Sequence, residues 1–427
     1  MLIHQIARQA LHGLVMMCLM LLIIPASGQT RITSPYSYYG LGEMRFNQNF
    51  SNMGMGGLGI GFRSNKSVND VNPASYAGVD SLSFVFEATL FSHFYQQSDI
   101  NSDQMGNYTS LGSLAFSSPI TRWLSFAFGI KPFSSMGYKI RDYSSDEQIG
   151  TMNFLYEGRG GINQVFAGAA IQPFKGLSIG LNASYLFGML ERHTTSYSDS
   201  SAIFLVNKVA VNEVNGWHFG LGAQYHTPAF SETGSLTFGL IYGMEQDLDV
   251  TRNEVIRRAM PGSASYDTLS NVQGLASQLT IPSYLGAGVF ARLNSQWSGG
   301  LDFYQQNWSD FVIFGSPGDL INSYRVAVGI QHNPSVQTFS NFFNRLEYRA
   351  GFRYGQTYLN PSDHALDEFG ISFGLGIPLR RSLSGVNIGF EMSQRGTTDH
   401  DLIKENFYRI NLGIQVHERW FLRRRFF

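Results

Sequence analysis

Histidine, serine and acidic residues are the first candidates for chemistry, because they can bind metals, transfer protons or attack a substrate. The chain has 427 residues and 10 histidines. The histidines are scattered along the sequence, and no pair has the His-Glu-x-x-His spacing of a zinc site. No pairing of a serine with a histidine can be argued from the spacing either. We therefore predict no catalytic residue, no metal site, no cofactor and no enzymatic activity.

Charged residues within apolar stretches are the second group of candidates. Each occupies the less apolar set of positions in a stretch where apolar and small or polar residues alternate. A charged inner wall is the ordinary way to hydrate or brace a membrane barrel. We expect these residues to line a lumen: Glu87, Lys131, Glu347, Arg349, Arg353, Glu391 and Arg409.

The glycine-rich segment from Gly54 to Gly78 could be a phosphate-binding loop, a linker or a plug. A phosphate loop needs a following helix and a Gly-Lys-Ser/Thr sequence, and Lys66 has neither. A free linker is disfavoured by the many apolar residues, which include Leu58, Ile60 and Phe62. A compact irregular piece inside a pore remains, because its backbone can find partners there and its glycines permit tight folding.

The rest of the chain consists of long alternating stretches, so the predicted fold is all-β. Many stretches run well beyond the usual strand of about 5–6 residues, as a bilayer-crossing barrel requires. We predict about fourteen strands, an even number that permits closure. They are 81–97, 107–121, 122–140, 151–174, 176–197, 206–227, 234–258, 273–293, 296–312, 322–334, 343–359, 365–379, 385–398 and 406–417.

The connections alternate between tight turns and more polar, mostly longer loops. The tight turns often carry proline, as at Pro119 and Pro173, and we assign them to the periplasm. The loops should face outside the cell, at 98–106, 141–150, 198–205, 259–272, 313–321 and 399–405.

Composition favours a membrane barrel over a large soluble β-protein. Charged residues make up 14% of the chain, below the soluble average of about 25%, and aromatic residues also reach 14%. The formal net charge of -1 gives no reason to expect a nucleic-acid partner. Outer-membrane lipid is the expected environment, in a diderm bacterium, with the protein as a monomer.

The N-terminus predicts export. Arg8 precedes an apolar run from Leu14 to Ile24 that is too short to span a bilayer well, and small residues follow. We expect residues 1–28 to be a cleaved signal peptide, although an uncleaved anchor is the alternative. Residues 29–79 would form an N-terminal hatch, 80–417 the transmembrane barrel and 418–427 a short basic periplasmic tail.

The hatch region resembles that of the FadL/TodX family of outer-membrane transporters for hydrophobic compounds. The resemblance covers the whole mature chain in layout, but only the hatch in motif. The residues that carry it precede the first barrel strand: Gly54, Gly56, Gly57, Asn72, Pro73 and Ala74. It implies a fourteen-strand barrel with a plug in its lumen and diffusion of a fatty-acid-like ligand through it. It also implies hatch movement and sideways exit near the third strand.

The third strand has a feature that suits such an exit. Pro132 cannot donate to a β-ladder, so it predicts a bulge or a local break in pairing. The alternative is that Pro132 lies above the membrane, where the strand ends. The candidate residues of the break are Pro132, Phe133, Ser134 and Gly137.

Two functions follow, from different classes. The first is passive transport of hydrophobic small molecules. The second is a non-transporting docking or secretion partner of the PorV type, which should have a sealed wall and long structured outer loops. Four apolar residues expected to face the lumen could form an apolar pocket or pack against the hatch: Val85, Phe91, Leu186 and Ile241.

Overall fold

The computed structural model is a closed antiparallel barrel whose described residues belong to one compact unit. The structure describes residues 34–45, 49–100, 102–146, 150–198, 203–227, 234–263, 265–334, 341–379 and 382–419. The predicted signal peptide therefore lies outside the described residues. In the described part, no helix combines the length and the apolar character needed to cross a membrane.

Fourteen wall strands close the barrel in the described part, as the sequence predicts. Each strand pairs with its neighbours in sequence, and the last pairs with the first, β19 with β2. Ten of them are β2 (Ser83–Ser98), β3 (Asp103–Pro119), β4 (Leu124–Asp146), β5 (Gly150–Phe174), β6 (Leu177–Ser198), β7 (Leu205–His226), β16 (Glu347–Gln356), β17 (Asp367–Pro378), β18 (Gly385–Arg395) and β19 (Lys404–Arg419).

Two further wall strands are each interrupted once. β7 pairs with β9 (Gln246–Ala259) along one part and with β8 (Ser235–Gly243) along the other, so β8 and β9 form one wall strand. β10 (Asp267–Ile281) and β11 (Tyr284–Arg292) form the next, with Pro282 at the interruption. The last two wall strands are β12 (Trp297–Gln306) and β15 (Ser323–His332).

The alternation of side chains explains why these stretches form a barrel. In β17, Phe369, Ile371 and Phe373 are 40%, 40% and 56% exposed, whereas Ser372 between them is 1% exposed. The same pattern of exposed apolar and buried small or polar residues continues around the wall. An apolar outer band with a polar interior is the pattern of a barrel in lipid.

Residues 34–45 and 49–82 precede β2 and pack against the inner face of the wall; we call them the hatch. The hatch contains η1 (Pro35–Tyr38), β1 (Glu43–Met44), α2 (Phe50–Met53) and η2 (Pro73–Gly78). Some backbone nitrogens of the hatch bond to side chains of the wall, among them those of Gly56, Gly59 and Ile60.

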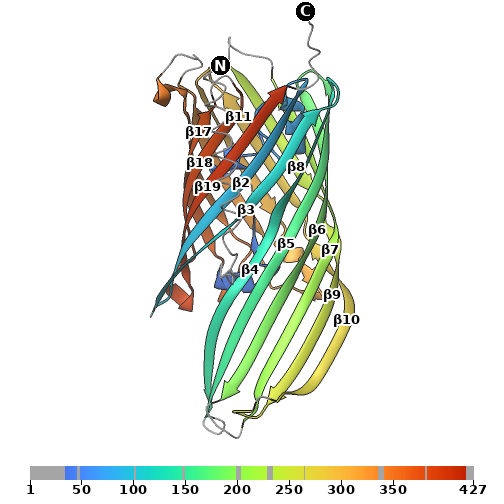
Figure 1. Cartoon of the computed structure of the whole chain (residues 1–427), viewed down its shortest axis with the longest axis vertical. Coiled ribbons are helices and arrows are strands. Elements are labelled where there is room, and N and C mark those ends of the chain that lie inside the picture. Colours follow the sequence, from blue (N-terminus) through green and yellow to red (C-terminus); the bar gives the residue numbers. More distant parts are fainter. Residues whose placement is uncertain are drawn as a thin grey trace, which may run out of the picture. The chain divides into compact units, whose positions relative to one another are not determined.

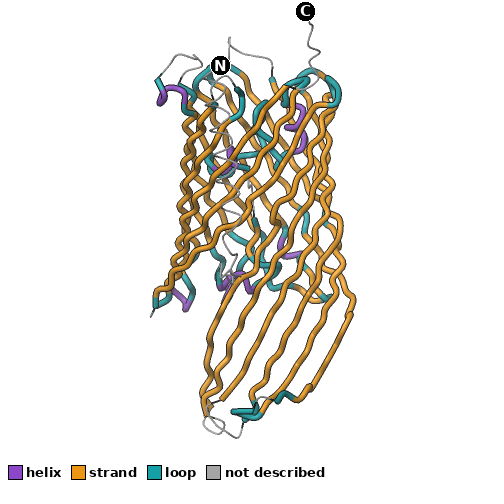
Figure 2. Tube along the Cα trace, in the orientation of Figure 1, coloured by secondary structure: helices purple, strands orange, loops and turns teal. Residues whose placement is uncertain are grey.

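Six strands of the wall continue past the others on the side of the longer loops: β4, β5, β6, β7, β9 and β10 (Figures 1 and 2). We call this part the projecting wall. β5 has 25 residues, whereas β12 on the opposite side has 10. The sequence prediction ended the third strand at residue 140 and assigned 141–150 to a loop, but β4 continues to Asp146. Residues 267–272 likewise belong to β10, not to a loop.

Three further connections on this side contain short elements. β13 (Val312–Ile313) and β14 (Ser316–Pro317) form a small hairpin after η3 (Trp308–Asp310). The others contain η5 (Pro361–Asp363) and η6 (Asp399–Asp401), while η4 (Phe342–Arg345) lies in a turn at the opposite end. The sequence prediction missed the connection at 357–366. β19 continues to Arg419, and residues 420–427 of the expected tail lie outside the described residues.

Candidate functional site

The hatch rests directly on glycines of the wall. A Cβ added to Gly351 of β16 would lie 2.1 Å from the backbone nitrogen of Gly56. A Cβ on Gly239 of β8 would lie 2.0 Å from the carbonyl oxygen of Ile60. Real Cβ atoms do not approach so closely, so only glycine permits this backbone-to-backbone contact. The small inward residues of the alternating pattern therefore make room for the plug.

One wall carboxylate binds the glycine-rich turn. Asp302 of β12 is 5% exposed and accepts hydrogen bonds from the backbone nitrogens of Gly59 at 2.6 Å, Ile60 at 2.8 Å and Gly61 at 3.3 Å. Consecutive N–H groups pointing at one anion form the type of site that phosphate loops use. The anion of this turn is thus a side chain of the protein itself.

The Asn-Pro-Ala motif anchors the other end of the hatch. Asn72 caps η2 by accepting from the Ala74 nitrogen at 3.1 Å, and Pro73 occupies the first turn, where no N–H is needed. The Asn72 amide also donates to the carbonyl of Ile60 at 2.8 Å and to that of Ala223 in β7 at 3.2 Å. A single side chain therefore ties η2 to the glycine-rich turn and to the wall.

The wall is interrupted between β3 and β4. The two strands pair only from Leu114 with Ile130 to Pro119 with Ser125. Beyond this point, in the described residues, β3 pairs only with β2, while β4 continues its pairing with β5. Figure 1 shows the two strands diverging. A register shift at Pro132–Ser134 leaves Phe133 as an extra residue in β4.

The N-terminal part of the hatch takes the place of β3 at this edge. β1 pairs with β4, with Glu43 opposite Ser135 and Met44 opposite Ser134. The Arg45 nitrogen donates to the carbonyl of Phe133 at 2.9 Å. Gly137 accepts from the Ser34 nitrogen at 3.1 Å and donates to the Ser37 hydroxyl at 3.1 Å. All four residues proposed for the strand break lie in or beside this segment.

A cavity of about 140 Å³ lies beside β1. Hatch residues form one side of it, and β2 and β3 contribute Thr89, Phe91 and Gly112. β12, β15–β19 and the β16–β17 connection close the remainder. The lining contains five arginines and three glutamates: Arg45, Arg325, Arg353, Arg395, Arg409, Glu43, Glu368 and Glu391. Apolar groups such as Met44 and Phe91 share the lining, so the cavity is amphipathic.

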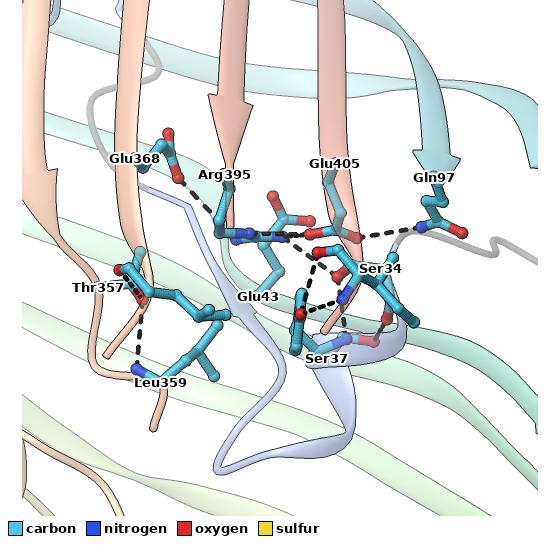
Figure 3. A network of polar contacts seen from close by, with 12 residues as sticks. Ser34, Ser37, Glu43, Gln97, Thr357, Leu359, Glu368, Arg395 and Glu405 are labelled. Carbon is cyan, nitrogen blue, oxygen red and sulfur yellow. Dashed lines mark hydrogen bonds and ion pairs between the residues drawn. The ribbon is translucent and has the colours of Figure 1, made fainter. Parts of the chain in front are cut away.

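A buried network holds the charges in place (Figure 3). Arg395 donates to Glu405 at 2.6 and 2.9 Å and to the Ser34 hydroxyl at 3.2 Å. Glu405 is fully buried and also accepts from Gln97 at 3.1 Å. Buried charges must be paired in this way, because desolvating an unpaired charge is costly. The network therefore fixes the start of the hatch to β2, β18 and β19.

The seven charged residues singled out in the sequence fall into two groups by their contacts. Four of them contact the hatch: Glu87 accepts from Asn49 at 2.5 Å, Lys131 pairs with Asp70, Glu347 pairs with Lys66 at 3.3 Å, and Arg349 lies over the Phe50 ring. The other three form a cluster at the cavity: Glu391 pairs with Arg353 at 2.7 Å and with Arg409 at 3.4 Å.

An apolar cap covers the hatch on the side of the longer loops. Trp308, Phe311 and Leu320 come from the β12–β15 connection and pack with wall residues such as Leu190, Leu248 and Leu279. Tyr358 of the β16–β17 connection packs on Trp308, with ring centroids 4.8 Å apart, and donates to the Gly42 carbonyl. Burial raises the pKa of the Tyr358 phenol, which keeps it a donor.

For four apolar residues the sequence leaves two roles open, lining a pocket or packing against the hatch, and the structure contains both. Val85 packs with Val68 and Tyr76 of the hatch, Leu186 belongs to the cluster under the cap, and a Cβ on Gly286 would touch both Ile60 and Ile241. Only Phe91 of the four lines the cavity.

Two features were accessible from the sequence but were missed. Asp302 alternates with Leu301 and Phe303, which places its carboxylate inside. Residues 370–374 match the Gly-x-Ser-x-Gly pattern of serine hydrolases, but Ser372 lies in the middle of β17, and its hydroxyl accepts from the Gly56 nitrogen at 2.8 Å. The strand-to-helix turn that a nucleophile needs is not at this position. The described residues contain no group of three metal-ligating side chains.

Three solved structures share the fold with this chain at low sequence identity. The Pseudomonas putida toluene transporter TodX is 16% identical with a TM-score of 0.58, over 87% of this chain and 98% of that one. The Ralstonia pickettii toluene transporter TbuX is 15% identical with a TM-score of 0.56, over 89% and 99%. A Pseudomonas aeruginosa FadL homologue is 13% identical with a TM-score of 0.54, over 89% and 100%.

These likenesses establish that the fold is that of the FadL-type barrels, as the hatch motif predicts. No curated protein matches the chain. The family model that does match is described as BamG, and it covers residues 10–427, nearly the whole sequence. With its plugged fourteen-strand barrel, the chain belongs to the BamG family.

Proposed function

We propose that the protein is an outer-membrane barrel that passes small amphipathic molecules sideways between its lumen and the membrane. The observation that carries the proposal is the separation of β3 from β4, with β1 of the hatch bound to the exposed edge. An opening in the wall would let an apolar molecule pass from the lumen directly into the membrane, without leaving through a polar end of the barrel. The short turns would face the periplasm and the longer loops the outside.

The cavity beside β1 indicates the class of molecule. Its arginines and glutamates suit a polar end, and Met44 and Phe91 suit an apolar portion. The toluene transporters and the FadL homologue that share the fold support a hydrophobic cargo. Residues 34–45 are the part of the hatch that must move, because they lie between the cavity and the gap.

The direct test is to lock β1 onto β4. Met44 and Ser134 face each other in the ladder, so Met44→Cys with Ser134→Cys places two thiols across it. The only natural cysteine, Cys18, lies in the predicted signal peptide. Entry of a fluorescent dodecanoate analogue into vesicles containing the oxidised variant should fall to the rate of protein-free vesicles. Reduction should restore it.

A matched control carries a disulfide elsewhere in the wall. Ser196→Cys with Val206→Cys joins β6 to β7 in the projecting wall, far along the chain from β1. Oxidation of this control should leave entry unchanged. Entry through the locked barrel at the normal rate would contradict lateral passage.

Docking of another protein is the second candidate, in the sense of the PorV-like alternative. The cap packs over the hatch, which suits docking, whereas the separation of β3 from β4 does not. The observation that favours docking is the projecting wall, which extends beyond the apolar outer band. Its surface carries ion pairs, such as Lys139 with Glu157 and Arg159 with Glu191.

A further inference from the structure

The side chain of Arg45, in the hatch, crosses the gap between β3 and β4. Its guanidinium donates to the Tyr108 hydroxyl of β3. It also donates to the Ser135 hydroxyl of β4, from Nη2 at 3.0 Å and from Nε at 3.3 Å. Both hydroxyls lie beyond Leu114 and Ile130, where the pairing of the two strands ends. Arg45 therefore joins the two strands where their ladder no longer does.

Neighbouring side chains hold Arg45 in this position. The Tyr108 hydroxyl is fixed by Nδ1 of His93 in β2, which lies 2.6 Å from it. The guanidinium carbon lies 5.4 Å from the centre of the Phe91 ring and 5.5 Å from that of Tyr108, within the range of cation–π attraction. The Arg45 side chain is only 6% exposed. A molecule that leaves through this part of the gap must first displace it.

The charge of Arg45 is incompletely paired. Among the described residues its nearest carboxylate is that of Glu43, whose Oε2 lies 3.6 Å away, too far for a hydrogen bond. By contrast, Arg395 lies 2.6 Å from the carboxylate of Glu405. Hydrogen bonds from a guanidinium to a carboxylate are stronger than those to neutral hydroxyls. Arg45 would therefore gain by exchanging Tyr108 and Ser135 for the carboxylate of a ligand.

A second arginine lies at the same aromatic ring. The guanidinium carbon of Arg409 is 5.9 Å from the centre of the Phe91 ring. Arg409 Nη1 lies 3.4 Å from Glu391, while its Nε is buried and has no hydrogen-bond partner among the described residues. Arg45, Phe91 and Arg409 all line the cavity beside β1. An anionic group there would reduce the repulsion between the two cations and could accept from the unused donor.

We propose that Arg45 couples the cavity to the gap, and that the anionic end of an amphipathic molecule is what releases it. The carboxylate would bind Arg45 and Arg409, and the bonds of Arg45 to Tyr108 and Ser135 would break. The inference rests on the proposed lateral passage and adds the charge of its ligand. A ligand shifts a conformational equilibrium only if it binds one state better than the other. A carboxylate meets this condition here, whereas an alcohol of the same length lacks the charge.

The test measures the width of the gap in the full-length barrel in lipid nanodiscs. Spin labels at Thr109→Cys in β3 and Lys139→Cys in β4 occupy exposed positions on its two sides. Double electron–electron resonance then gives their separation with dodecanoate or dodecanol at equal mole fractions in the lipid. Dodecanoate should lengthen the separation, and dodecanol should need about 10-fold more for the same effect, as expected for one hydrogen bond to a charge.

Three variants identify the residue responsible. Arg45→Gln should show the long separation without ligand and respond to neither compound. Tyr108→Phe keeps the charge and the ring but removes the acceptor on β3, so it should populate the long separation without ligand and still respond to dodecanoate. Ser117→Ala is the matched control. Its hydroxyl also joins β3 to β4, by donating to the Phe126 carbonyl at 2.9 Å, but it does so in the paired part. This variant should behave as the unaltered protein does.

Two results would overturn the proposal. One is equal lengthening by dodecanol and dodecanoate, and the other is a short separation without ligand in both Arg45→Gln and Tyr108→Phe. Because Tyr108→Phe removes a single oxygen, it keeps the test valid if Arg45→Gln does not fold. If either result occurs while oxidation of the Met44→Cys, Ser134→Cys variant still stops entry, lateral passage stands and only the role of Arg45 fails.

Discussion

The carboxylate of Asp302 lies 2.6 Å from the backbone nitrogen of Gly59 and holds the hatch to the wall. The two residues are 243 positions apart, so the bond forms only when the barrel closes around the hatch. Because it joins a charge to three amides in a buried site, it is among the strong contacts of the hatch.

Asp302→Asn should loosen the hatch without unfolding the barrel. Loss of a hydrogen bond to a charged group costs about 1.5–3 kcal/mol. Amide hydrogen exchange at residues 59–61 should therefore accelerate by one to two orders of magnitude. Ser372→Ala removes the neutral bond to Gly56 and should have a smaller effect, about 0.5–1.5 kcal/mol. Equal exchange in Asp302→Asn and the unaltered protein would show that the contact does not hold the turn.

Gly351→Ala should displace the hatch. The added methyl group would overlap backbone atoms of Met55 and Gly56. Backbone atoms cannot rotate aside as the end of a side chain can. We expect a folded barrel whose hatch is cut by protease, as seen by limited proteolysis and mass spectrometry. Ala350→Val in the same strand points outward and is the control. A hatch that resists protease equally in both variants would contradict direct backbone contact.

Arg395→Ala should destabilise the barrel strongly, because it leaves the fully buried Glu405 without its cation. The expected loss is about 3–5 kcal/mol, measured by urea unfolding in detergent. Arg395→Leu with Glu405→Leu should lose much less, since neither charge is then left buried. If the double variant is as unstable as the single one, the cost arises from packing and not from the unpaired charge.

Trp308→Ala should open the cap. Trp308 is 1% exposed and packs on Phe311 and Tyr358, so its removal should cost about 3–5 kcal/mol of local stability. Residues 308–322 and 357–366 should then exchange amide protons faster, while the strands keep their protection. Phe343→Ala, at an exposed position in η4, is the control and should change neither segment. Protection of both segments in Trp308→Ala would show that the cap is held by other contacts.

The alternation of residues was sufficient to predict the barrel and its fourteen strands. Side chains in a strand point to opposite faces, so Phe369, Ile371 and Phe373 determine which face meets the surroundings wherever the strand lies. The same local rule placed Glu391 and Arg409 inside. It also placed Pro132 at an irregularity, because a residue without an N–H group cannot complete a ladder.

Only the tertiary structure decided which residues meet. Asp302 could be placed inside from its neighbours, but its partner, the Gly59 turn, depends on how the hatch folds within the closed barrel. The same holds for Arg395 with Ser34, for β1 at the edge of β4, and for the length of the projecting wall. Contacts between distant segments depend on register and closure, and no local pattern in the sequence records either of them.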